Sequence, residues 1–445
     1  MNKEHIYNNL DDLSSDQLCE YIKLGQVTIE ELQSTGNLDA SKRRAIRTCL
    51  EQAEKADENA WKEAQSHHTE EAYKNYLEKF PNSKYIFYAR IELKNLEDKR
   101  IKEEEEKKRI LSAIKNNPNA YPPGIIRTYL NDGSLSKSSL IDIGIPDEII
   151  DRLYKNDLPR DWELGQTPVS IPDGYTEVYF WGIRGSGKTT ALSAVLSTAD
   201  KMGYLEIAQG PGYNYMLQLQ NLFNNSIATL PGSTNTDVTQ YLPFTLKKPK
   251  EKYYRSVSLI ELSGEIFQCF LYKNANKPLK VQEEETFNSL LRFLKGDNRK
   301  LHFFFIDYDK SNRVDQDGYT QANYLNAAAT FFNNPKYNIF RKSTDAIYIV
   351  ITKSDLMPGA KESRIQNLSQ YLNRDNYTAF VNSLKAKCEE HSINNGRLLG
   401  TPFSLGKVYF TEICEFDDIT SQNIIDILMR RIPQSKKSIL DVFNK

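Results

Sequence analysis

The chain has 445 residues, and its 58 lysines and arginines nearly balance its 59 aspartates and glutamates, for a formal net charge of −1. A chain of this length predicts two or three domains. The balanced charge argues against nucleic acid or an anionic membrane as the main partner, and no apolar run approaches the roughly 20 residues that span a bilayer.

The cysteines lie far apart in the sequence and lack the C-x-x-C spacing of a zinc or redox site. We therefore expect reduced, mostly buried thiols rather than a disulfide framework, which favours a cytoplasmic location. The polar sequence after Met1 has no apolar signal-peptide core, which favours the same location. The five cysteines are Cys19, Cys49, Cys269, Cys388 and Cys414.

Residues 1–157 are rich in charged and helix-forming residues, and they contain an internal repeat. A pattern of Tyr, Gly, Thr or Ser, Leu and Gly in residues 21–36 recurs at a constant offset of 108 residues in 129–144. Each copy predicts a helix ended by a glycine, a Thr or Ser N-cap, and a second short helix ended by another glycine. We place the two helical hairpin modules in residues 1–56 and 98–157.

Residues 57–97, between the copies, resemble a single tetratricopeptide-type helical hairpin with Pro81 as its break. One such unit cannot bury its apolar faces alone, so we expect this helical region to contact a protein partner. The charged run 102–109 predicts a solvated helix, with ion pairs of the i,i+4 type. The expected pairs are Glu103 with Lys107, Glu104 with Lys108 and Glu105 with Arg109.

Prolines interrupt residues 158–171, which we interpret as a linker. From 172 to 445, apolar strands alternate with helices in the α/β pattern of a P-loop NTPase G domain, a mostly parallel sheet with one antiparallel edge strand. A short polar connection separates the second and third strands, which predicts an antiparallel hairpin. The expected strands are 178–181, 241–246, 256–262, 301–306, 346–351 and 407–410.

The first of these strands runs into a glycine-rich loop. The spacing of Gly182, Gly187, Lys188 and Thr189 fits G-x-x-x-x-G-K-[ST], a loop whose N–H groups close around phosphate oxygens. Lys188 would reach the outer phosphates, and Thr189 would place its hydroxyl on Mg²⁺. The residues expected to contact nucleotide here are Gly182, Arg184, Gly185, Ser186, Gly187, Lys188, Thr189 and Thr190.

Two further motifs make the chain resemble P-loop GTPases of the translation-factor and Ras-like class. Glu261-Leu-Ser-Gly264 ends the third strand, and Thr352-Lys-Ser-Asp355 ends the fifth. The resemblance implies GTP or GDP and Mg²⁺ as cofactors, with Glu261 holding the metal and the Gly264 N–H meeting the γ-phosphate. Glu261 stands where the class has aspartate, which keeps the charge but lengthens the arm.

The motif of Thr352, Lys353 and Asp355 fits [NT]-K-x-D, which reads the base in that class. A carboxylate at Asp355 accepts two hydrogen bonds from guanine, whereas adenine would leave it unpaired and buried. The resemblance also implies a switch threonine that covers Mg²⁺, for which we favour Thr234, with Thr236 as the next candidate. It further implies a base contact from Thr411, at the end of the last strand.

Two residues bear on the hydrolysis rate. Arg184 either blocks the approach to the γ-phosphate, donates charge in cis, or turns to solvent. Glu265 lies where many GTPases carry a glutamine that orients water, and its charge repels the γ-phosphate, so we expect slow hydrolysis without a partner. Within the class, the chain resembles the GTPases attached to helical modules in bacterial conflict or defence loci.

Two other interpretations stay open at this point. Residues 301–307 fit a Walker B strand, which would make the protein a regulatory ATPase of the AAA+ or signal-transducing type, with Asp307 as the metal-binding acid. Alternatively, the protein has the GTPase fold but does not catalyse nucleotide hydrolysis. The protein would then be a nucleotide-bound scaffold whose helical region does the work.

Overall fold

The computed structural model describes residues 3–35, 38–154, 170–207, 209, 212–231, 239–310, 313–359, 364–373 and 375–435. The chain forms two compact units, residues 1–112 and 113–445, and each is described by itself. Within the described ranges, no helix is both long and apolar enough to cross a membrane.

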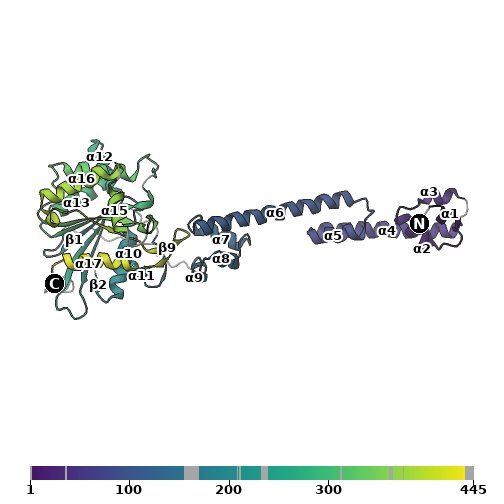
Figure 1. The fold of residues 1–445 in the computed structure, drawn as a ribbon, viewed down its shortest axis with the longest axis horizontal. Coiled ribbons are helices and arrows are strands. Elements are labelled where there is room, and N and C mark those ends of the chain that lie inside the picture. The colour runs from purple at the N-terminus through teal and green to yellow at the C-terminus, as the bar shows by residue number, and fades with distance from the viewer. Residues whose placement is uncertain are drawn as a thin grey trace. The chain divides into compact units, whose positions relative to one another are not determined.

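The first unit is entirely helical (Figure 1). Ser14 and Thr28 are the N-caps of α2 and α3, and each forms a capping box. The hydroxyl of the N-cap accepts a hydrogen bond from the backbone N–H three residues later, and the Gln or Glu side chain at that position accepts one from the N–H of the N-cap. Trp61 packs against Tyr73 and stacks on Tyr85, and these rings form the core between the longer helices. The helices are α1 (Lys3–Asn8), α2 (Ser15–Lys23), α3 (Ile29–Ser34), α4 (Ala40–His67), α5 (Glu70–Lys79) and α6 (Ile86–Asn116), the last of which continues into the second unit.

A disulfide joins Cys19 on α2 to Cys49 on α4, with their Cα atoms 6.5 Å apart. The expectation of five free thiols is therefore wrong for this pair, although Cys269, Cys388 and Cys414 are free and buried. Two cysteines on separate helices carry no spacing signal in the sequence, because only the packing of the helices brings them together. The argument for a cytoplasmic location from reduced thiols no longer holds.

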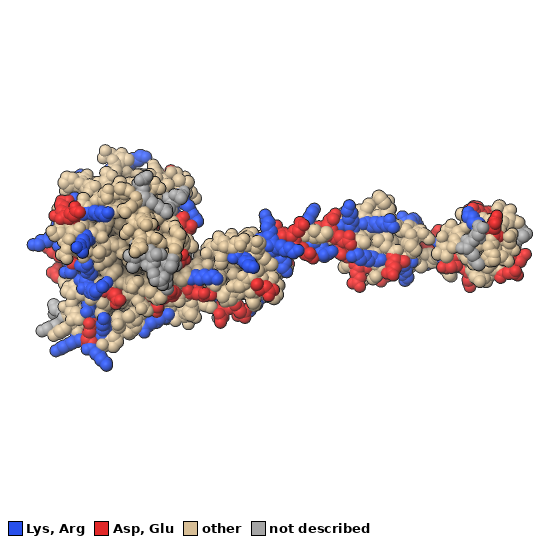
Figure 2. Space-filling view, viewed as in Figure 1, with Lys and Arg blue, Asp and Glu red and all other residues tan. Residues whose placement is uncertain are grey.

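The charged run of α6 is solvent-exposed, as expected. Figure 2 shows basic and acidic side chains intermixed along this helix. The ion pairs include Lys99–Glu103 and Arg100–Glu104 at i,i+4, and Arg109–Glu106 at i,i+3. Glu103 and Glu104 thus pair with basic residues four positions before them, not with the expected Lys107 and Lys108, because exposed side chains choose among several neighbours of similar energy.

The second copy of the repeat belongs to the second unit. Its helices are α7 (Pro123–Asn131), α8 (Lys137–Asp142) and α9 (Asp147–Arg152), and Ser136 begins α8 with a capping box as Thr28 begins α3. Arg152 Nε donates to Thr229 Oγ1 at 2.9 Å, and the Phe410 N–H donates to the Pro118 carbonyl at 2.9 Å. These bonds attach the copy to a small three-stranded sheet of β3 (Ile227–Thr229), β10 (Ile413–Phe416) and β9 (Gly406–Tyr409).

The main sheet has seven strands in the order β2-β4-β5-β1-β6-β7-β8, and only β4 runs against its neighbours. The predicted α/β architecture and the antiparallel pairing of β4 with β5 are confirmed. The short β2 then pairs with the outer side of β4. The strands are β1 (Thr176–Trp181), β2 (Leu205–Ile207), β4 (Gln240–Leu246), β5 (Arg255–Glu261), β6 (Lys300–Asp307), β7 (Thr344–Thr352) and β8 (Leu399–Pro402).

Helices cover both faces of this sheet (Figure 1). Val178 and Phe180 of β1 face one helical layer, whereas Tyr179 and Trp181 face the other, as the two-residue period of a strand requires. The first layer contains α10 (Lys188–Lys201), α11 (Tyr213–Leu222) and α17 (Ile419–Arg431). The second contains α12 (Ile266–Asn274), α13 (Val281–Lys295), α14 (Gln321–Asn333), α15 (Arg364–Leu372) and α16 (Asp375–Glu390).

The last predicted strand, 407–410, does not belong to the main sheet. It forms β9 of the small sheet, and β8 takes the place beside β7. The four residues of β8, Leu-Gly-Thr-Pro, lack β-branched alternation, which is why no strand was predicted there. Gly400 permits this strand to pack closely, because a Cβ on it would lie 2.6 Å from Leu368 Cδ2.

Candidate functional site

The phosphate loop connects β1 to α10 at the carboxyl end of the parallel strands. Gly185 and Gly187 have φ angles of +68° and +87°, which side chains with a Cβ rarely adopt. A Cβ on Gly182 would lie 2.4 Å from Ser186 Oγ and 2.9 Å from the Phe305 carbonyl oxygen. The loop therefore needs its glycines, and it leads directly into the N-terminus of α10, where backbone N–H groups attract an anion.

Lys188 is buried inside this loop. Its Nζ donates to the carbonyl oxygens of Gly182 at 2.8 Å and Ile183 at 3.0 Å. Burial lowers the pKa of Lys188 to about 8, and the charges of Glu261 and Glu265 oppose that shift. A phosphate would restore full charge on this amine, because an anion stabilises the protonated form.

Glu261 ends β5, beside β1, and lies next to Thr189. The Thr189 hydroxyl donates to Glu261 Oε1, and the hydroxyl of Tyr215 donates to Glu261 Oε2 at 3.0 Å. Burial raises the pKa of Glu261, while the bond from Thr189 and the charge of Lys188 oppose this shift. Tyr215 comes from α11, within an insertion where a single tyrosine carries no motif, and sequence reasoning missed it.

Thr189 and Glu261 fit a Mg²⁺ site, since a hydroxyl and one carboxylate are ligands that Mg²⁺ takes together with substrate phosphates. In the part of the chain that the structure describes, no group of three or more His, Cys, Asp or Glu side chains could hold a metal. The phosphates would therefore have to complete the coordination. Thr234 and Thr236, the expected switch threonines, lie outside the described residues.

Gly264 packs against the backbone of the phosphate loop. A Cβ on Gly264 would lie 2.2 Å from the nitrogen of Arg184 and 2.5 Å from its Cα. The side chain of Arg184 is exposed to solvent, which is the third of the three arrangements considered for this residue above, after blocking the γ-phosphate and donating charge in cis. Thr190 is half-buried in the first turn of α10, next to Thr189.

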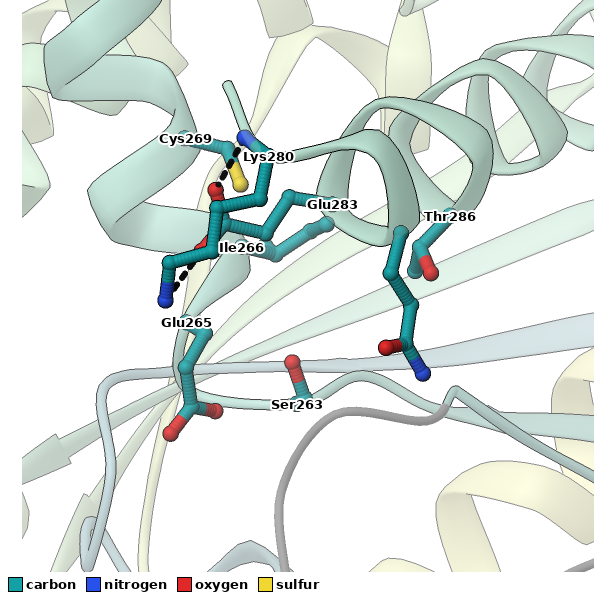
Figure 3. A pocket seen from close by; sticks show the side chains of 8 residues that line it. Ser263, Glu265, Ile266, Cys269, Lys280, Glu283 and Thr286 are labelled. Atoms are coloured by element: carbon teal, nitrogen blue, oxygen red, sulfur yellow. Dashed lines mark hydrogen bonds and ion pairs between the residues drawn. The ribbon is translucent and has the colours of Figure 1, made fainter.

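Glu265 directly follows Gly264 and precedes α12. Its Oε2 is buried and has no hydrogen-bond partner among the described residues. Beside it lies a small hollow, which Ser263 and Glu283 also line (Figure 3). The Glu265 charge acts on Lys188, so this carboxylate lies close enough to influence the phosphate site.

Thr352 brings the 352–355 motif next to the loop of residues 182–189. Its Oγ1 donates to the Ser186 carbonyl at 2.9 Å, and a Cβ on Gly187 would lie 3.2 Å from Thr352 Cγ2. Asp355 is half-buried in the turn that follows β7. The neighbouring Ser354 N–H donates to the Phe403 carbonyl at 3.1 Å, which ties this turn to the end of β8.

Lys353 lies between two carboxylates from the end of β6. Its Nζ is 3.2 Å from Asp307 Oδ2 and 3.3 Å from Asp309 Oδ2. Asp307 is fully buried, and its Oδ1 accepts from the Asp309 N–H at 2.9 Å. Of the two candidate metal-binding acids, Glu261 and not Asp307 accepts a hydrogen bond from the Thr189 hydroxyl.

Thr411 lies away from these motifs, in the turn between β9 and β10. Its φ is +65°, and its N–H donates to Asn119 Oδ1 at 2.7 Å. The assignment of Thr411 to a base contact rested on β9 being a strand of the main sheet, and that placement is wrong. Phe403 and Ser404, which follow β8, occupy the corresponding position beside the Ser354 turn.

No protein-family model matches the sequence, and no curated protein matches it. Among solved structures, a nucleolar GTP-binding protein from Plasmodium falciparum is similar at 12% identity and a TM-score of 0.25, over 59% of this chain and 88% of that one. A TM-score this low supports no conclusion about this chain.

Proposed function

We propose that the protein binds GTP and GDP with Mg²⁺ and hydrolyses GTP slowly, as a regulatory switch. The observation that carries the proposal is the convergence of three motifs at one end of the sheet. The Thr189 hydroxyl meets Glu261, the backbone at Gly264 packs on Arg184, and the Thr352 hydroxyl meets the Ser186 carbonyl. Such contacts between residues far apart in sequence support one shared nucleotide site.

Each residue then has a definite task. The loop N–H groups and Lys188 bind the phosphates, and Asp355 accepts two hydrogen bonds from the guanine edge. Mg²⁺, when bound through Thr189 and Glu261, neutralises charge on the outer phosphates. Tyr215 orients the Glu261 carboxylate, because its hydroxyl holds the oxygen that Thr189 does not.

Glu265 is the reason to propose slow turnover. It lies beside the phosphate site with a buried oxygen that lacks a hydrogen-bond partner among the described residues. A carboxylate there can accept a proton from water, yet it repels the approaching γ-phosphate. A protein partner that neutralises this charge would accelerate hydrolysis.

The helical region is proposed as the surface for such a partner. Phe87, Tyr88 and Ile91, at the start of α6, expose 68%, 59% and 40% of their surface. Exposed apolar side chains grouped on one helix are typical of protein interaction sites. The proposed bacterial and cytoplasmic setting remains a prediction from the sequence.

A displacement titration tests the guanine assignment. Unlabelled GTP should displace fluorescent GDP from the purified protein, and Asp355→Asn should weaken GTP and GDP binding at least about tenfold while ATP binding stays weak. Equal displacement by ATP and GTP would instead favour the regulatory ATPase. Against that alternative, Asp307 pairs with Lys353, and the Thr189 hydroxyl donates to Glu261.

Single-turnover hydrolysis separates a switch from a nucleotide-bound scaffold. Protein loaded with GTP and Mg²⁺ should convert it to GDP over minutes to hours. If bound GTP is hydrolysed no faster than GTP in buffer alone, the protein is instead the nucleotide-bound scaffold.

A further inference from the structure

Backbone carbonyl groups of the phosphate loop accept hydrogen bonds from three side chains. Lys188 holds the carbonyls of Gly182 and Ile183, and Thr352 holds that of Ser186. The carbonyl of Arg184 accepts from Lys310 Nζ at 2.8 Å. Once Lys188 turns to a bound phosphate, Thr352 and Lys310 are the side chains that still hold the loop.

Lys310 reaches the loop from the turn Tyr308–Lys310, which directly follows β6. Its ammonium lies over the loop, because a Cβ on Gly185 would be 2.7 Å from Lys310 Nζ. A side chain at Gly185 would make this lysine tip move, in addition to meeting the φ of +68° that favours glycine there. The side chain is half-buried, and desolvation lowers its pKa, whereas the charge of Asp307 opposes the shift.

The neighbouring lysine is used differently. Lys353 forms ion pairs with Asp307 and Asp309, so two carboxylates offset its charge. Lys310 forms no ion pair with a carboxylate of a described residue, and its hydrogen bond goes to a neutral carbonyl. The charges of Asp307 and Asp309 act on Lys310 without a direct ion pair, so its ammonium can still pair with an anion that enters the loop.

We propose that Lys310 is a second phosphate-loop lysine, a positioning residue that holds the Arg184–Gly185 peptide and adds positive charge beside the β- and γ-phosphates. The inference rests on the proposed function, since it assumes that the loop binds nucleotide phosphates. No residue of the sequence motifs has this role. A lysine after β6 is part of no G-x-x-x-x-G-K-[ST] pattern, and only the folded sheet brings it to the loop.

The test measures dissociation constants of GTP, GDP and GMP for wild type, Lys310→Met and Lys310→Arg. Arg313→Met is the matched control, because Arg313 follows on the same segment but pairs with Asp309 at the surface. Lys310→Met should weaken GTP and GDP binding about tenfold or more, and GMP binding by less than about twofold. Lys310→Arg should restore most of the loss, and Arg313→Met should match wild type.

Thermal melting of each variant checks that folding is intact. Unchanged GDP and GTP affinity in Lys310→Met would overturn the inference, as would an equal loss for GMP, which would indicate a general distortion of the site. Either result leaves the proposed function intact if wild type binds GDP. Failure of the wild type to bind any guanine nucleotide would overturn both.

Discussion

Replacing Thr352 with valine tests whether this residue holds the phosphate loop. Valine keeps the branched shape but removes the hydroxyl that donates to the Ser186 carbonyl at 2.9 Å, and the Thr352 side chain is buried. An unsatisfied buried carbonyl costs about 1–3 kcal/mol. The free loop can shift to let water reach this carbonyl, whereas bound nucleotide fixes the loop. We therefore expect about 1–2 kcal/mol to appear as lost affinity, or about 5- to 30-fold in the dissociation constant.

Displacement of fluorescent GDP measures this loss. Thr352→Ser keeps the hydroxyl and serves as the matched control, with an affinity within about threefold of wild type. The preference for GTP over ATP should not change in either variant, because the hydroxyl contacts the loop. Wild-type affinity in Thr352→Val, or equal losses in the two variants, would refute the reasoning.

Three further predictions concern rate, stability and pH. Glu265→Gln should accelerate single-turnover GTP hydrolysis several-fold and strengthen GTP binding more than GDP binding, because it removes a negative charge that repels the γ-phosphate. Glu283→Gln, which lines the same hollow, should have no effect on either. Cys19→Ser should lower the free energy of unfolding of α2 and α4 in urea by about 3.6 kcal/mol in non-reducing buffer, which is the chain-entropy value for cysteines 30 residues apart. Equal urea midpoints for Cys19→Ser and oxidised wild type would contradict this prediction. Burial raises the pKa of Glu261, so its protonation competes with Mg²⁺ at a higher pH than in an exposed glutamate. The Mg²⁺-dependent part of GTP affinity should therefore fall as the pH is lowered, starting at a higher pH than an exposed glutamate would give. Glu261→Gln should remove that dependence, and a flat profile in wild type would exclude Glu261 as a ligand.

Local sequence signals predicted the parts of the fold that depend on neighbours in the chain. The phosphate loop, the hairpin of β4 and β5, and the caps at Thr28 and Ser136 follow from residues within a few positions of one another. The order of the motifs along alternating strands also predicted that Glu261 would end a strand beside the loop. Parallel strands place their carboxyl ends at one edge, so the motifs had to meet there.

Residues that act through packing were not predictable in the same way. Tyr215 reaches Glu261 only because α11 packs on α10. Lys310 meets the loop because β6 lies beside β1, and Cys19 meets Cys49 because α2 packs on α4. The misplacement of Thr411 has a related cause, since β9 has a stronger strand pattern than β8 but joins another sheet.

The central claim is that the motifs at 182–189, 261–264 and 352–355 form one Mg²⁺-dependent guanine nucleotide site. Isothermal titration of the full chain with GTP and with ATP, each with Mg²⁺, tests it most directly. We expect one GTP per chain and ATP at least about 100-fold weaker, because adenine lacks the N1–H and 2-amino donors that guanine offers to the Asp355 carboxylate. Equal affinities for the two nucleotides, or no binding of GTP, would contradict the claim.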